Sequence, residues 1–219
     1  MLTQKANLLR VINNIYFKKN EPISLVHFIT NRCNARCSFC FIDFDNPDTF
    51  KGELTLDEID KLTQNLGKSL LNVNLTGGEP FARKDIVDIA KIYLKNTTIQ
   101  SMYITTNASL PDRIENFAKT INSLDNNLEL NFQISIDDFP KNHDKVRKID
   151  NLFDSCLDTY RRLKKLELQN VNPIVSITVS HENCNNIEEI FYYLTDKCKI
   201  DSLKCCIVRD EGVYSRPKE

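Results

Sequence analysis

Several strand-like segments of this chain alternate apolar and polar residues, and this alternation restricts the folds that it can adopt. Because successive side chains of a strand point to opposite sides, each such segment has one apolar and one polar face. In segment 130–137 the apolar face consists of Leu130, Phe132, Ile134 and Ile136, and the polar face of Asn131, Gln133, Ser135 and Asp137. Strands of a parallel sheet that helices cover on both sides are instead apolar throughout. We therefore expect a sheet with one apolar face that is shielded from water, the dry face, and one polar face that is open to water, the wet face.

Strand and helix patterns alternate along the chain, which is typical of a parallel α/β fold. The expected strands are 24–29, 71–76, 100–106, 130–136, 173–180 and 203–208. Parallel strands with helices on one side and a polar opposite face predict a partial (β/α)6 open barrel, with helices on its outer face. Its concave face should line a cavity, with ligands near the carboxyl ends of the strands. A flat sheet whose exposed face binds a partner domain is the alternative.

Local signals mark several helices. Thr55-Leu-Asp-Glu58 forms a capping box ahead of an apolar stripe, and Pro111 suits the first turn of the next helix. Two more helices are expected from apolar stripes, one from Leu152 to Leu163 and one over 185–198. We expect one core over 24–208, preceded by an N-terminal helix over 1–23 and followed by a tail over 209–219 that could begin a further C-terminal region.

Composition excludes some classes of function. Lysine and arginine number 29 against 30 aspartates and glutamates, a formal net charge of -1, so the chain lacks the basic footprint typical of nucleic-acid binding. No apolar run reaches the roughly 20 residues of a membrane span, and the N-terminus does not resemble a signal peptide. We expect a soluble, cytoplasmic protein without a membrane partner.

Three of the eight cysteines lie within eight residues, in Cys33-Asn-Ala-Arg-Cys37-Ser-Phe-Cys40, directly after the first expected strand. Without a secretion signal, such a group favours a metal or catalytic thiols over disulfides. Three thiolates can hold a [4Fe–4S] cluster and leave its fourth iron open to another ligand. A zinc ion completed by a distant residue and redox-active thiols are the other interpretations.

The spacing of these cysteines, with Phe39 before the last one, resembles the signature of the radical S-adenosylmethionine (radical SAM) superfamily. Thr76-Gly77-Gly78-Glu79-Pro80, at the end of the second expected strand, is similar to the motif with which that family holds the methionine part of S-adenosylmethionine. Adjacent glycines let the backbone approach a ligand closely. A tight turn between strand and helix is the simpler interpretation of this motif alone.

Weaker similarities extend along the chain. Asn107 ends the third expected strand, where the family often has a similar turn near the cofactor, and Ser135 and Asp137 end the fourth. Arg147 suits the methionine carboxylate geometrically, although it could equally be an exposed helix arginine. Asp138 stands where many relatives have glycine. The resemblance thus implies the following cofactor-binding residues: Phe39, Thr76, Gly77, Gly78, Glu79, Asn107, Ser135, Asp137 and Arg147.

The resemblance implies a partial barrel of the radical SAM type, and an enzyme with a [4Fe–4S] cluster on Cys33, Cys37 and Cys40. An external one-electron reductant, of the flavodoxin or ferredoxin type, would let the cluster cleave S-adenosylmethionine to methionine and a 5′-deoxyadenosyl radical. That radical would take hydrogen from an unidentified substrate, a peptide or a biosynthetic intermediate. A naturally compact enzyme and a core without its C-terminal substrate domain are both consistent with the length, and the resemblance favours the second.

The alternative from another class is an iron–sulfur or zinc module that serves in sensing or electron transfer. It requires a fourth protein ligand, for which no nearby residue is obvious. Among the other cysteines, Cys156 and Cys198 are expected to be buried thiols. Cys205 and Cys206 are neighbours in the sixth expected strand, so one of them must face the cavity. The further candidates for the concave face are Asn72, Asn74, Asn131, Gln133, Ser176 and Thr178, whereas His27 is expected to pack in its strand.

Overall fold

The computed structural model describes residues 9, 12–13, 16–17 and 22–209. Most of the expected N-terminal helix over 1–23 and nearly all of the expected tail over 209–219 lie outside these residues. Within them, the strands are β1 (Ser24–Thr30), β2 (Asn72–Gly77), β3 (Ser101–Thr106), β4 (Glu129–Ser135), β5 (Val171–Val179) and β6 (Leu203–Ile207). The α-helices are α2 (Leu56–Leu66), α3 (Ile86–Asn96), α4 (Pro111–Leu124), α5 (Pro140–Arg147), α6 (Leu152–Lys165) and α7 (Ile187–Tyr192).

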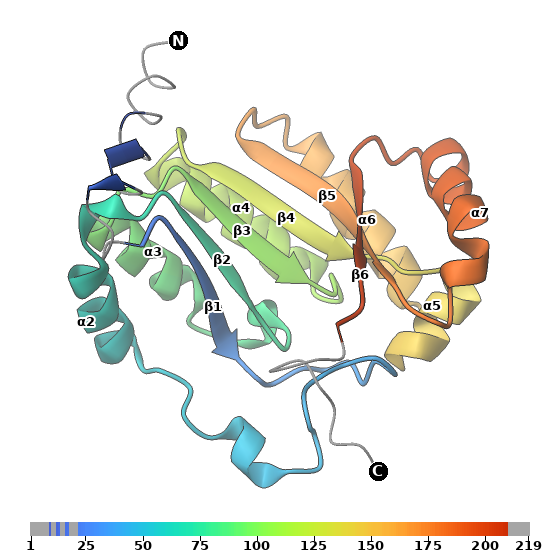
Figure 1. Ribbon diagram of the computed structural model, residues 1–219. Helices are drawn as coiled ribbons and strands as arrows, with labels where there is room; N and C mark the ends of the chain where they lie inside the picture. Colours follow the sequence, from blue (N-terminus) through green and yellow to red (C-terminus); the bar gives the residue numbers. More distant parts are fainter. Residues whose placement is uncertain (1–8, 10–11, 14–15, 18–21, 210–219) are drawn as a thin grey trace.

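The six strands form one sheet in the order β1-β2-β3-β4-β5-β6, and every neighbouring pair is parallel. Helices lie along one side of the sheet, and the carboxyl ends of the strands share one edge, under which the segment after β1 passes (Figure 1). The sheet does not close on itself. The predicted partial (β/α)6 open barrel with helices on its outer face is therefore confirmed.

The alternation of apolar and polar residues in the strands gives the sheet one buried face and one partly exposed face, as predicted. On β2, Val73 and Leu75 are fully buried against the helices, whereas Asn72 and Asn74 on the opposite face are only partly buried. His27 also belongs to the dry face, where its Nδ1 lies 2.9 Å from the hydroxyl of Tyr93. The expectation that His27 is a packed strand residue is confirmed.

Aromatic packing anchors the end of β2 in the core. The Phe81 ring follows Glu79-Pro80 and lies 5.5 Å from the Phe117 ring and 6.4 Å from the Phe132 ring, centre to centre. All three rings are fully buried. Such packing between rings adds to the free energy of burial and holds the turn after β2 in a defined position at the edge of the sheet.

The helix signals are confirmed with one exception. The capping box at Thr55 forms, with its hydroxyl accepting from Glu58 N and the Glu58 carboxylate accepting from Thr55 N, and α4 begins at Pro111. The segment expected as one helix over 185–198 consists of a 3-10 turn, the short helix α7 and a π-helical turn over Tyr193–Lys197. In the described part of the chain, none of the helices is both long and apolar enough to cross a membrane.

Candidate functional site

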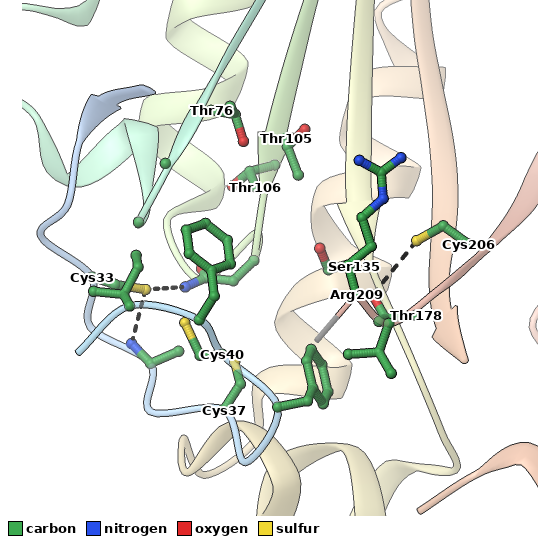
Figure 2. Close-up of a pocket in the computed structure, with 18 of the residues that line it drawn as sticks. Cys33, Cys37, Cys40, Thr76, Thr105, Thr106, Ser135, Thr178, Cys206 and Arg209 are labelled. Atoms are coloured by element: carbon green, nitrogen blue, oxygen red, sulfur yellow. Dashed lines mark hydrogen bonds between the residues drawn. The ribbon is translucent and has the colours of Figure 1, made fainter. Parts of the chain in front are cut away.

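The segment that follows β1 carries three cysteines along one wall of a cavity. Cys33, Cys37 and Cys40 line this cavity, whose volume is about 430 Å³. Figure 2 shows the three side chains next to one another on their loop, and Cys206 of β6 on the opposite wall. All eight cysteines lie in the described residues, and none forms a disulfide. The loop therefore brings three thiols to the carboxyl edge of the sheet.

Close contact between two backbones holds this loop beside β2. Gly78 N donates to Thr30 O at 2.7 Å, and Glu79 N donates to Arg32 O at 2.9 Å. A Cβ atom on Gly77 would lie 2.1 Å from Thr30 O, and one on Gly78 would lie 2.2 Å from Arg32 O. These distances leave no room for a side chain, so the glycine pair is required for packing the cysteine loop, whether or not a ligand is present.

The end of α5 holds the loop from the other side. The last carbonyls of a helix lack partners within the helix, and here those of Val146 and Arg147 accept the amides of Ser38 and Arg36, both at 3.1 Å. Ala35, between these contacts, is buried. The cysteine loop is thus fastened to two elements that are far apart in the sequence.

Burial makes two of the three loop thiols weaker acids. It raises the pKa of Cys33 to about 11, and it also raises the pKa of Cys37. Both are therefore protonated thiols near neutral pH. Because metals bind the thiolate, a metal at this site has to displace protons.

Glu79 lies beneath the cavity and not on its wall. Its side chain is 1% exposed and accepts hydrogen bonds from Phe81 N at 3.0 Å, Thr106 Oγ1 at 2.7 Å and Asn107 N at 2.7 Å. Burial raises the pKa of Glu79, and these three donors act against that rise. The carboxylate joins the ends of β2 and β3.

A buried ion pair lies at the end of β4. Arg147 Nη2 and Nε lie 2.7 and 2.8 Å from Asp137 Oδ2, and Asp137 Oδ1 accepts from Thr178 N at 2.9 Å. Arg147 is 6% exposed and lines the cavity, with its guanidinium carbon 5.8 Å from the centre of the Phe39 ring. The alternative that Arg147 is an exposed helix residue is wrong, because α5 turns this side chain inward to its partner.

A family model described as the radical SAM superfamily matches residues 28–193. The chain belongs to the radical SAM superfamily. Two curated relatives are the GTP 3′,8-cyclases of Cronobacter sakazakii and Yersinia pestis, which are 43% and 39% identical to it over 84 and 82 residues. Each alignment covers 36% of this chain, and they cover 25% and 24% of the relatives. The chain thus spans about a quarter of these relatives.

Solved structures show the same radical SAM fold. Streptococcus suis SuiB bound to S-adenosylmethionine superimposes with a TM-score of 0.66 at 16% identity, over 95% of this chain and 47% of SuiB. The structure of anSMEcpe with bound AdoMet gives a TM-score of 0.66 at 18% identity, over 85% of this chain and 51% of anSMEcpe. At these identities the likeness concerns the fold. This chain spans about half of each solved protein.

Enzymes of the radical SAM superfamily use a [4Fe–4S] cluster and S-adenosylmethionine, and the residues present fit both. The loop supplies three soft thiol ligands, which suit iron–sulfur clusters. The described residues include no group of three or more His, Cys, Asp or Glu side chains close enough to hold one metal ion. This is compatible with a cluster, because each cysteine of a cubane binds a different iron. The adjoining cavity is within the roughly 300–1,000 Å³ of small-molecule sites.

The structure brings together most of the residues that the sequence singled out. Those lining the cavity are Phe39, Thr76, Gly77, Gly78, Asn107, Ser135, Arg147 and the three loop cysteines. Glu79 and Asp137 do not line it and instead hold residues that do. Cys206 lines it, as expected for one member of the Cys205–Cys206 pair, and Cys156 and Cys198 are buried as expected. Of the six concave-face candidates, Asn74 and Thr178 reach the cavity.

Sequence reasoning missed the apolar part of the cavity wall. It is formed by Val26, Phe28, Phe41, Ile42, Ile207 and Val208, with Arg209 beside them. Strand register contained a usable signal, because Val26 and Phe28 pair with Asn74 and Thr76 and therefore share the concave face. Their apolar character concealed that position, since apolar residues are normally assigned to the core.

Proposed function

We propose that this chain is the core of a radical SAM enzyme that cleaves S-adenosylmethionine at a [4Fe–4S] cluster held by Cys33, Cys37 and Cys40. One observation carries the proposal. The three thiols and the Gly77-Gly78 turn border the same cavity, and backbone hydrogen bonds connect the cysteine loop to this turn. The chemistry available from cluster and S-adenosylmethionine together is one-electron cleavage to methionine and a 5′-deoxyadenosyl radical, which takes hydrogen from a substrate. Residues 24–208 form the unit that performs it.

The polar side of the cavity is the proposed S-adenosylmethionine site. Thr76, Gly77 and Gly78 offer backbone groups to the amino end of the molecule. Arg147 offers positive charge to the carboxylate while Asp137 keeps it in place, and Phe39 and Ser135 complete this wall. Glu79 and Asn107 position the turns beside it. Support comes from the shared cavity lining and from the buried Arg147–Asp137 pair.

The apolar side is the proposed substrate side. Val26 is 53% exposed and Phe28 is 40% exposed, so a substrate that covers them removes apolar surface from water. Excluding water there also protects a reactive intermediate from side reactions. The relatives point to two kinds of substrate: SuiB has been solved with the precursor peptide SuiA, and the curated relatives are named GTP 3′,8-cyclases. We propose a peptide or a small biosynthetic intermediate, and an external one-electron reductant of the flavodoxin or ferredoxin type.

Anaerobic reconstitution with iron and sulfide tests the proposal. After reduction with dithionite, the wild-type chain should convert S-adenosylmethionine to 5′-deoxyadenosine, measured by chromatography. Cys40→Ala should reduce this yield at least about a hundredfold, because one of three ligands is lost. Cys184→Ala is the matched control, since Cys184 is exposed and lies outside the cavity; its yield should equal that of the wild type.

Two results would contradict the proposal. A loaded and reducible cluster that yields no 5′-deoxyadenosine would favour a module for sensing or electron transfer. Zinc in place of iron, in protein purified anaerobically and analysed for metals, would favour a structural metal site.

A further inference from the structure

The turn after β3 points an amide directly at the cysteine loop. Asn107 Nδ2 lies 2.8 Å from Asn34 Oδ1 and 3.8 Å from Cys33 Sγ. The backbone amide of Ala35 also donates to this sulfur, at 3.3 Å. Cys33 Sγ therefore accepts from one main-chain donor on its own loop and from one side-chain donor on another element.

The orientation of the Asn107 amide is determined by its neighbours. Asn107 Oδ1 accepts from the backbone amide of Ser109 at 3.0 Å. A backbone amide can only donate, so it must face the oxygen of the side chain and not its nitrogen. The NH2 group is left to face Asn34 and Cys33.

The backbone of this turn is held from several sides. Asn107 N donates to the buried carboxylate of Glu79, and Ala108 N donates to Thr106 Oγ1 at 3.0 Å. Ala108 has a φ of 57°, a left-handed conformation that a non-glycine residue keeps only where its surroundings impose it. The carbonyls of Asn107 and Ala108 accept three further contacts, from Ser155, Cys156 and Thr159 of α6. The turn thus presents Asn107 to the loop in a fixed position.

We propose that Asn107 sets the reduction potential of the cluster through its hydrogen bond to Cys33 Sγ. The inference rests on the proposed function, because it requires a cluster on Cys33. Reduction adds negative charge, which is shared by the cysteine sulfurs, and a donor to a sulfur stabilises the reduced state more than the oxidised state. Hydrogen bonds to the sulfurs are one of the factors that set such potentials. Asn107 is thus a positioning and tuning residue that acts through Cys33.

Variants at Asn107 change the donor with little change in size. Asn107→Asp keeps an oxygen for Ser109 N but presents a carboxylate oxygen to the sulfur in place of N–H. Asn107→Leu removes the donor without adding charge. Ser109→Ala is the matched control, because it removes a hydroxyl that accepts from Asn34 Nδ2 at 2.8 Å and keeps the backbone amide that holds Asn107 Oδ1. Each chain is reconstituted anaerobically and analysed for iron and sulfide, and its midpoint potential is measured by redox titration with electron paramagnetic resonance detection.

The expected order of midpoint potentials is Asn107→Asp lowest, Asn107→Leu intermediate, and wild type and Ser109→Ala highest and equal. A variant with full iron content and a shifted midpoint potential has a changed potential and an intact cluster site. If one Asn107 variant loads iron poorly, the other alone tests the inference. Equal potentials in wild type and in loaded Asn107 variants would overturn the inference and leave the proposed function intact. A wild-type chain that takes up no cluster would overturn both.

Discussion

At the scale of single residues, Gly78 shows how a cofactor motif can be a packing requirement. The motif resembles a backbone cradle for S-adenosylmethionine, yet the nearest obstacle to a side chain is the chain itself, at Arg32 O. The same residue lines the cavity. Its small size therefore serves two purposes, and the packing purpose exists before any ligand binds.

Gly78→Ala is expected to displace the cysteine loop. The added methyl group meets a carbonyl oxygen at 2.2 Å, and backbone cannot give way as a flexible side chain would, so the change should cost roughly 1–3 kcal/mol. The iron content after reconstitution should fall well below that of the wild type. Gly67→Ala is the control, because its Cβ position is open while its φ of 68° strains an L-residue; it should lose stability but load iron normally. Normal loading of Gly78→Ala would show that the loop can shift without losing the site.

At the scale of elements, α5 has a function that its length alone does not suggest. It is an eight-residue helix, and short helices depend on tertiary contacts for stability. Two of its last carbonyls hold the cysteine loop, and its last residue reaches back to Asp137. Lys148, the residue that follows the helix, has a left-handed conformation with a φ of 55°.

Lys148→Gly should stabilise the protein. A left-handed conformation costs an L-residue roughly 1–2 kcal/mol, and glycine is the preferred residue at this position after a helix. We expect the free energy of unfolding in urea to rise by about 1 kcal/mol. Lys148→Ala removes the same side chain but not the strain, so it should bring no such gain. A loss of stability in Lys148→Gly would mean that the lysine side chain itself contributes to holding the loop.

At the scale of the whole molecule, two histidines are buried in their neutral form. Burial lowers the pKa of His27, under the sheet, to about 4, and it lowers the pKa of His143, in α5, to about 2. Both values lie below the 6.5 of an unfolded histidine. The unfolded chain therefore binds protons that the folded chain excludes, and stability that is full above about pH 6.5 is lost as the pH falls.

When the pH is lowered from 7 to 5, the free energy of unfolding should fall by about 2 kcal/mol for each of these histidines. Urea unfolding of the chain without metal at the two pH values measures the sum. His27→Gln should reduce the difference by about 2 kcal/mol, whereas His181→Gln should leave it unchanged, since His181 is exposed on the surface. A pH dependence that is the same in His27→Gln and wild type would mean that His27 keeps its proton when the protein folds.

Local sequence patterns were enough to predict the strands and helices, the apolar and polar faces of the sheet and the cysteine loop. Each expected strand lies within two residues of an observed one, because strand alternation, capping residues and cysteine spacing are local patterns set by backbone geometry. The sequence also predicted that the cysteine loop and the Gly77-Gly78 turn lie at the same edge of the sheet, because parallel strands bring their carboxyl ends together.

The folded structure was needed to show which of these side chains face the cavity and what holds them there. Glu79 and Asp137 lie beneath the cavity wall although they are polar. Val26 and Phe28 lie on the wall although they are apolar, so residue type alone does not reveal which side chains line the cavity. The glycine pair proved to be required by two backbone carbonyls about 46 residues away in the chain, those of Thr30 and Arg32. Such constraints arise from contacts between distant segments, whose distances exist only once the chain has folded, and so no local pattern carries them.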